Sequence, residues 1–231
     1  MDIAEFDEFA EEYEDQHRAN IAMTGESPEF FAAYKIAEFA EFTGEMNKDG
    51  ARILDFGSGI GNSIPFFRRH FPKTQLTCAD PSARSIAFSQ RRFPGSEHYT
   101  LLVGPEIPQK ADAFDMIFSA CVFHHVRQAE HAHWLGELLR VTRPGGLLMI
   151  FEHNPLNPVT VRAVNRCPFD ENAVLIRAKM LARSLQKAGW GRPTLRYHIF
   201  FPRALAGLRP LEKWLRWAPL GAQYSAMVRR P

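Results

Sequence analysis

One run of ten residues constrains the fold of this chain more than any other part of its sequence. In Ile53–Asn62, an apolar strand ends around the carboxylate of Asp55, passes through glycines at alternate positions (Gly57, Gly59 and Gly61) and leads into a helix. Such a strand, turn and helix form the floor of an adenosine-containing ligand site in α/β sheets. The run therefore predicts an α/β sheet with a ligand at the carboxyl end of this strand.

The spacing of the glycines argues against a dinucleotide. The dinucleotide fingerprint is G-x-G-x-x-G, and its third glycine position falls on Asn62 when it is counted from Gly57. Asp55 would also oppose a pyrophosphate, whereas it suits a ligand that carries an ammonium or sulfonium group. Asp80 ends the next strand, where a carboxylate can accept hydrogen bonds from both ribose hydroxyls. An NAD-dependent enzyme is therefore the weaker alternative.

Apolar strands alternate with helical patterns through the middle of the chain, which is typical of a doubly wound parallel sheet. Two helices are also expected before the first strand, and they would form a cap over the sheet. The expected strands are 51–56, 75–79, 98–103, 114–119, 147–151, 194–201 and 223–228, and the expected helices are 2–22, 28–43, 62–70, 82–92, 127–141, 173–188 and 204–217. We interpret 1–231 as a single domain, with a helical cap (1–45), a ligand-binding core (50–152) and an irregular substrate-side insertion (153–172).

The composition is that of a soluble globular protein. Apolar residues make up 45% and charged residues 23%, and the formal net charge of +2 gives no argument for a nucleic-acid partner. Three widely separated cysteines show no disulfide or zinc spacing, which suits a reducing cytoplasm. The acidic N-terminus is the reverse of a signal peptide, and no apolar run approaches the roughly 20 residues that span a bilayer. We therefore expect a cytoplasmic protein without a transmembrane segment.

Four stretches in order carry a resemblance to a known family. They are Ile53–Gly61, Leu76–Ser82, Ala113–Ser119 together with Val122–Val126, and Arg143–Ile150. Over residues 50–152 the chain resembles the class I S-adenosylmethionine-dependent methyltransferases. The resemblance implies a seven-stranded, mostly parallel sheet whose last strand is antiparallel, with helices on both faces. It also implies S-adenosylmethionine as the methyl donor and S-adenosylhomocysteine as the product.

The resemblance also implies cofactor-binding residues. Asp55 and the glycine turn would face the methionine portion, Asp80 would hold the ribose, and Ser119 with Ala120 would line the cofactor and the mouth of the acceptor site. Tyr13, on the first cap helix, could reach the cofactor carboxylate or simply pack. The cofactor candidates are Tyr13, Asp55, Gly57, Ser58, Gly59, Gly61, Asp80, Pro81, Ser119 and Ala120. The contact to adenine stays open between backbone groups and Glu106, because Val103-Gly104 replaces the family's usual acid.

Methyl transfer is an in-line displacement, and a hydroxyl acceptor usually also needs a general base. His124 and His153 follow the fourth and fifth expected strands, so they are the candidate bases. His125, Arg166 and Asp170 are candidate substrate contacts. Each of these side chains could instead pack, cap a helix or face solvent. His125, His131 and His133 are too poorly placed for a metal cluster, so no metal is expected.

We therefore predict methyl transfer to a small or carrier-linked molecule in biosynthesis, with a hydroxyl oxygen as the favoured acceptor. N- or C-methylation and a catalytically silent S-adenosylmethionine-binding protein are the alternatives. Residues 205–220 combine leucines and tryptophans with basic residues, so they either contact a membrane surface peripherally or pack on the sheet. The acceptor and the oligomeric state are not indicated by the sequence.

Overall fold

The computed structural model describes residues 26–46, 49–167, 170 and 172–231. The expected helix 2–22 and the candidate cofactor contact Tyr13 lie outside the described residues.

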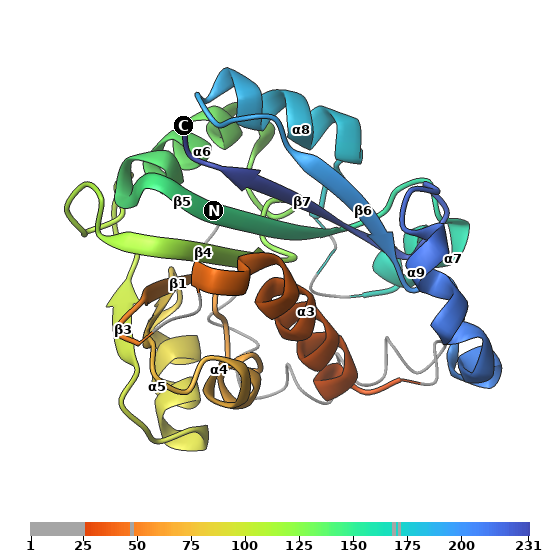
Figure 1. The fold of residues 1–231 in the computed structure, drawn as a ribbon, viewed down its shortest axis with the longest axis horizontal. Coiled ribbons are helices and arrows are strands. Elements are labelled where there is room, and N and C mark those ends of the chain that lie inside the picture. The colour runs from red at the N-terminus through yellow and green to blue at the C-terminus, as the bar shows by residue number, and fades with distance from the viewer. Residues whose placement is uncertain (1–25, 47–48, 168–169, 171) are drawn as a thin grey trace.

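A seven-stranded sheet forms the centre of the structure, in the order β3-β2-β1-β4-β5-β7-β6 (Figure 1). Only β7 runs antiparallel, between β5 and β6, and the other neighbouring pairs are parallel. The strands are β1 (Arg52–Phe56), β2 (Gln75–Asp80), β3 (His98–Leu101), β4 (Phe114–Ala120), β5 (Thr142–His153), β6 (Thr194–His198) and β7 (Gln223–Arg229). This topology confirms the predicted fold class.

Helices cover both faces of the sheet (Figure 1). Side chains of α3 (Pro28–Thr43) and α4 (Ile64–His70) pack with one face, and those of α6 (His131–Val141) and α8 (Ala178–Lys187) pack with the other. The other helices among the described residues are α5 (Ala83–Arg92), α7 (Pro158–Val164), α9 (Glu212–Leu215) and the 3-10 segments η2 (Gly44–Met46), η3 (Gln128–Glu130) and η5 (Arg203–Leu211). The two apolar layers bury both sides of the strands, as a parallel sheet requires.

The expected irregular insertion 153–172 contains a helix, α7, so that part of the prediction is wrong. Asn157 caps this helix by accepting hydrogen bonds from the backbone N–H groups of Val159 and Thr160, and Pro158 occupies its first turn. The next helix, α8, begins at Ala178, five residues later than the expected start at 173. The backbone N–H of Val174 instead donates to the carbonyl of His124, which ties this extended segment to the turn after β4.

The expected helix 204–217 is also corrected. Residues 203–211 form a 3-10 segment with Pro210 inside it, and a four-residue α-helix follows. Proline lacks the N–H that an α-helical hydrogen bond needs, which accounts for the interruption. Among the described residues, no helix combines the length and the apolar character that crossing a membrane would require.

Phe39 tests how strongly α3 is held on the sheet. Its side chain is fully buried, and its ring lies 5.4 Å from the rings of Phe71 and Phe118 and 6.2 Å from that of Phe67. We expect Phe39→Ala to lower the free energy of unfolding by about 3–5 kcal/mol, because the lost contacts leave a cavity. Urea denaturation measures this, with the half-buried Phe42→Ala as the control. Equal losses for the two variants would contradict this account of the α3 packing.

Candidate active site

The candidate site lies at the carboxyl edge of the sheet. β1, β2, β4 and β5 run parallel and end there, and β7 begins there because it is antiparallel, with Gln223 opposite His153. Ligands of doubly wound sheets bind at this edge. The candidates from the sequence therefore converge on one region through the topology of the sheet.

The glycine turn after β1 is closed on one side and open on the other. Gly57 and Gly61 have φ values of +75° and +80°, and an added Cβ would lie 2.3 Å from Val122 Cγ2 and 2.1 Å from Ser89 Oγ, respectively. Gly59 has a φ of +51°, and an added Cβ there would meet nothing within 4 Å. Positions 57 and 61 therefore require glycine, because both the positive φ and the close contact exclude a side chain. The open side at Gly59 leaves space for a ligand against the backbone.

Asp80 links the glycine turn to β2. Its Oδ2 accepts a hydrogen bond of 2.8 Å from the backbone N–H of Gly59, and its Oδ1 accepts one of 2.9 Å from that of Ser82. Ser82 in turn caps α5 by accepting from the N–H of Ser85. A carboxylate has about four lone-pair positions, and the hydroxyls of a ribose are donors that it can accept.

Asp55 is a buried carboxylate with an unused oxygen. Its exposure is 2%, and Oδ2 has no hydrogen-bond partner among the described residues. Burial, and secondarily the charge of Asp80, raises the pKa of Asp55 to about 8. The Oγ of Ser119, at the end of neighbouring β4, is also buried and unpartnered within the described part of the chain. Each such group costs about 1–3 kcal/mol, so these atoms and the open glycine turn fit a polar, cationic ligand such as S-adenosylmethionine.

On the acceptor side, Glu152 fixes the turn after β4. This fully buried carboxylate accepts hydrogen bonds from the N–H groups of Phe123 (2.8 Å) and Val122 (3.2 Å), and His124 Nδ1 donates to it over 2.6 Å. Burial opposes ionisation of Glu152, but His124 outweighs it, and the pKa of Glu152 is lowered. Val122 also packs against Gly57, so the turn connects the acceptor side to the cofactor floor.

His124 lies between two carboxylates. Its Nε2 is 3.5 Å from Asp170 Oδ1, and His125 Nε2 is 3.4 Å from the same oxygen. Burial acts against a charged imidazole, but Glu152 and Asp170 outweigh it and raise the pKa of His124 to about 10. Burial, with the charge of His124, lowers the pKa of His125 to about 3. Asp170 thus lies beside both His124 and His125, and all three are candidate site residues from the sequence.

A second polar cluster was not recognised in the sequence. Lys35 on α3, of which 8% is exposed, donates a 3.2 Å hydrogen bond to Sγ of Cys121, the first residue after β4. Burial favours the neutral thiol, but Lys35 and His153 outweigh it and lower the pKa of Cys121 to about 6. Tyr34 donates to Gln223 beside this pair. A lysine on the apolar face of the 28–43 helix was the one sequence signal for this cluster.

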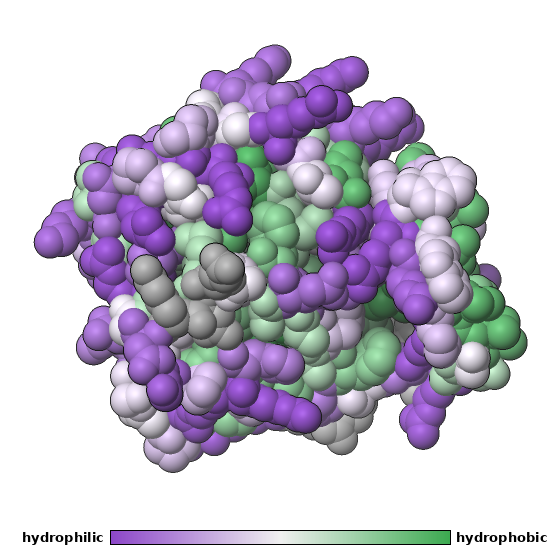
Figure 2. All heavy atoms as spheres, viewed as in Figure 1, coloured by the Kyte–Doolittle hydropathy of each residue, from purple (hydrophilic) through white to green (hydrophobic). Residues whose placement is uncertain are grey.

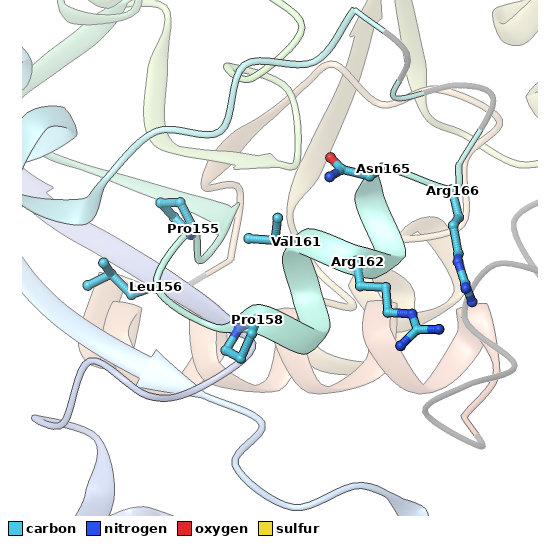
Figure 3. A pocket seen from close by; sticks show the side chains of 7 residues that line it. All are labelled: Pro155, Leu156, Pro158, Val161, Arg162, Asn165 and Arg166. Carbon is cyan, nitrogen blue, oxygen red and sulfur yellow. The ribbon is translucent and has the colours of Figure 1, made fainter.

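A surface pocket of about 560 Å³ lies along α7, directly after β5 (Figure 3). Its lining is apolar at one end and carries two arginines at the other, and it consists of Pro155, Leu156, Pro158, Val161, Arg162, Asn165 and Arg166. In the view of Figure 3, the side chains of Arg162 and Arg166 lie at the end of the pocket away from Pro155 and Leu156. No residue of the glycine turn is among these lining residues, and the pocket lies directly after the carboxyl end of β5.

Two other histidines from the sequence have structural contacts. The buried His131 Nε2 lies 3.0 Å from the carbonyl oxygen of Phe123 and 2.9 Å from that of Val126, and His133 contacts the carbonyl of Pro105. Neither of these contacts involves His125. Large apolar side chains of 205–220 are exposed, and they are Leu205, Leu208, Leu211, Trp214, Trp217 and Leu220. Green, hydrophobic spheres gather at the right margin of Figure 2, where this segment lies. Membrane contact by this segment stays a prediction.

Comparison with known proteins agrees with this geometry. A family described as a methyltransferase domain matches residues 53–146, which include the glycine turn, Asp80 and the turn after β4. Residues 53–146 thus form a methyltransferase domain of the class I S-adenosylmethionine-dependent type. A structure of this family from Thermotoga maritima superposes with a TM-score of 0.68 over 99% of both chains at 16% identity, which shows the shared fold.

Two relatives of similar sequence have names that state their methyl acceptors. A trans-aconitate 2-methyltransferase from Azoarcus sp. is 30% identical over 166 residues, which are 72% of this chain and 60% of the relative. A malonyl-[acyl-carrier protein] O-methyltransferase from Methylococcus capsulatus is 31% identical over 100 residues, which are 42% of this chain and 36% of the relative. The chain thus spans less than two thirds of the length of either relative.

The raised pKa of Asp55 predicts a pH-dependent affinity for S-adenosylmethionine. Without ligand, Asp55 holds its proton through neutral pH, so its contribution to stability is present at low pH and is lost as the pH rises through about 8. A cationic ligand favours the carboxylate, so binding at neutral pH should release most of a proton, and affinity should rise between about pH 6 and pH 8. Calorimetry in buffers of different ionisation enthalpy measures the release, and Asp55→Asn should abolish it. An identical proton count for the wild type and this variant would refute the assignment.

Proposed function

We propose that this methyltransferase transfers the methyl group of S-adenosylmethionine to an oxygen of a small or carrier-linked acid. The observation that carries the acceptor class is the pocket after β5, whose lining combines apolar side chains with Asn165 and the two arginines Arg162 and Arg166. Paired guanidinium groups recognise carboxylate and phosphate. The names of the two relatives support the same class, because trans-aconitate and malonyl groups both carry carboxylates.

The residues of this chain supply binding and orientation. The glycine turn, Asp55 and Asp80 would hold the cofactor, which supplies an electrophilic methyl group on its sulfonium. The acceptor oxygen attacks in line, the C–O bond forms as the C–S bond breaks, and S-adenosylhomocysteine leaves as a neutral thioether. A carboxylate oxygen is already anionic at neutral pH, so this acceptor needs no general base. Arginines that hold one end of the acid would orient the other end for attack.

The arginine pocket gives a direct test. With trans-aconitate and a malonyl thioester as acceptors, Arg162→Ala and Arg166→Ala should each raise KM about 10- to 100-fold, the loss of a charge-assisted hydrogen bond worth about 1.5–3 kcal/mol. The value of kcat should change little, because the contact is equally present before and during transfer. Mass spectrometry of the products measures both parameters.

The exposed Arg183 on α8 provides the matched control, since Arg183→Ala removes the same charge away from the pocket. A KM that rises equally in all three variants would rule out a specific role for the pocket. Binding of S-adenosylmethionine without transfer to any acid or hydroxyl acceptor would favour the silent, non-catalytic alternative.

A hydroxyl acceptor with a histidine base, as predicted from the sequence, is the second candidate. His153 favours it, because this partly exposed residue ends β5 beside Cys121, and its ring lies 5.2 Å from that of His124. Both ring nitrogens of His124 face carboxylates, so His153 is the better placed of the two predicted bases. N- or C-methylation, a cytoplasmic location and a role in biosynthesis stay predictions.

The two candidate acceptors make different demands on His153. If the acceptor is a hydroxyl, His153→Asn should lower kcat by about 10²–10⁴, the usual contribution of a general base. If it is a carboxylate, the same variant should keep most of its turnover. Turnover of His153→Asn, His124→Asn and the double variant on matched acid and alcohol acceptors measures the difference. Unchanged turnover on an alcohol in all three variants would exclude the histidine-base mechanism.

A further inference from the structure

Three atoms of the kinds that bind metal ions converge beside the turn after β4, and they come from two separate segments of the chain. They are Nε2 of His124, Nε2 of His125 and a carboxylate oxygen of Asp170, and all lie within 4.8 Å of one another. The two histidines follow β4, whereas Asp170 comes from the chain beyond α7. The spacing along the sequence does not predict this group, because only the fold brings Asp170 to the histidines.

Hydrogen bonds outside the group orient its members. Glu152 accepts from His124 Nδ1 at 2.6 Å, and this bond directs the opposite ring nitrogen toward Asp170. A carboxylate behind a ligand histidine in this way is the usual support of a metal-binding imidazole, since it fixes the tautomer and raises the basicity of the ring. The backbone N–H of Asp170 donates to Cys167, and its carbonyl accepts from Ala173, which positions this residue too.

The distances favour a shared ion over direct ion pairs. Asp170 Oδ1 lies 3.5 Å from one imidazole nitrogen and 3.4 Å from the other. Charge-assisted N–H···O bonds close to about 2.7–2.9 Å. Donor atoms bound to one tetrahedral ion at about 2.0–2.1 Å are in contrast separated by about 3.3 Å. The two separations from Asp170 match those of ligand atoms around a common centre.

We infer that His124, His125 and Asp170 form a binding site for a divalent transition-metal ion, with zinc as the closest match. Two imidazoles and one carboxylate suit zinc, cobalt or iron(II), whereas magnesium and calcium require mostly oxygen ligands. Three protein ligands leave a coordination position open, as in catalytic zinc sites. The site lies next to the cofactor floor, because Val122 of the same turn contacts Gly57. An open position there would take an oxygen of the acceptor.

Cobalt(II) binding tests this inference without cofactor or acceptor, so its outcome does not depend on the proposed function. Tag-free protein is treated with a chelator, dialysed and titrated with CoCl₂ while the visible d–d absorption is followed. One equivalent should bind with the absorption of a four- or five-coordinate ion, and ZnCl₂ should displace it. His125→Ala and Asp170→Asn should weaken binding at least tenfold. Glu152→Gln should weaken it about 10- to 100-fold through the ring of His124.

His133→Ala is the matched control, because it removes an exposed histidine outside the group and should bind as the wild type does. Circular dichroism and calorimetric binding of S-adenosylmethionine verify that each variant is folded. Three results would overturn the inference: no stoichiometric cobalt absorption, unchanged affinity in folded Asp170→Asn, or thiolate-to-cobalt bands that Cys121→Ser removes. The last result would place the ion on Cys121 instead.

Discussion

The acceptor side of the site depends on one buried carboxylate, Glu152. It is the next-to-last residue of β5, and it binds two backbone N–H groups of the neighbouring turn together with His124. A fully buried charge is costly unless such partners compensate it. Because β4 and β5 are adjacent, this compensation fixes the turn after β4 relative to the sheet. Val122 then closes one side of the glycine turn, and His124 faces Asp170.

The cofactor side could be predicted from the sequence because its determinants are contiguous. Asp55, the three glycines and Asp80 lie at the ends of two consecutive strands, and the topology of a parallel sheet brings those ends together. The strands themselves are short apolar runs between helices, a pattern that local periodicity reveals. The structure adds what periodicity cannot provide: the bond from Gly59 to Asp80 and the unpartnered oxygen of Asp55.

The acceptor side was less predictable because its contacts join residues far apart in the chain. The Lys35–Cys121 pair spans 86 positions, and neither residue belongs to a recognisable motif. His124 and His125 were identified as candidates, but their relation to Asp170 depends on the path of the chain after α7. The two corrected helix predictions have local causes in the sequence. Asn157 and Pro158 start the helix α7, and Pro210 interrupts the expected helix 204–217.

The distribution of charge at the sheet edge distinguishes between the candidate acceptors. A hydroxyl acceptor needs a nearby base with an available nitrogen. Both nitrogens of His124 face carboxylates, and the lowered pKa of about 3 makes His125 a weak base, so His153 stays the candidate base of the three. An acid needs a cation instead. Lys35 is engaged by the thiol of Cys121, and Arg162 on α7 with Arg166 just beyond that helix places further positive charge at the pocket after β5. A divalent ion held by the two histidines and Asp170 would add positive charge at the same edge, so the two proposals favour the same class of acceptor for independent reasons.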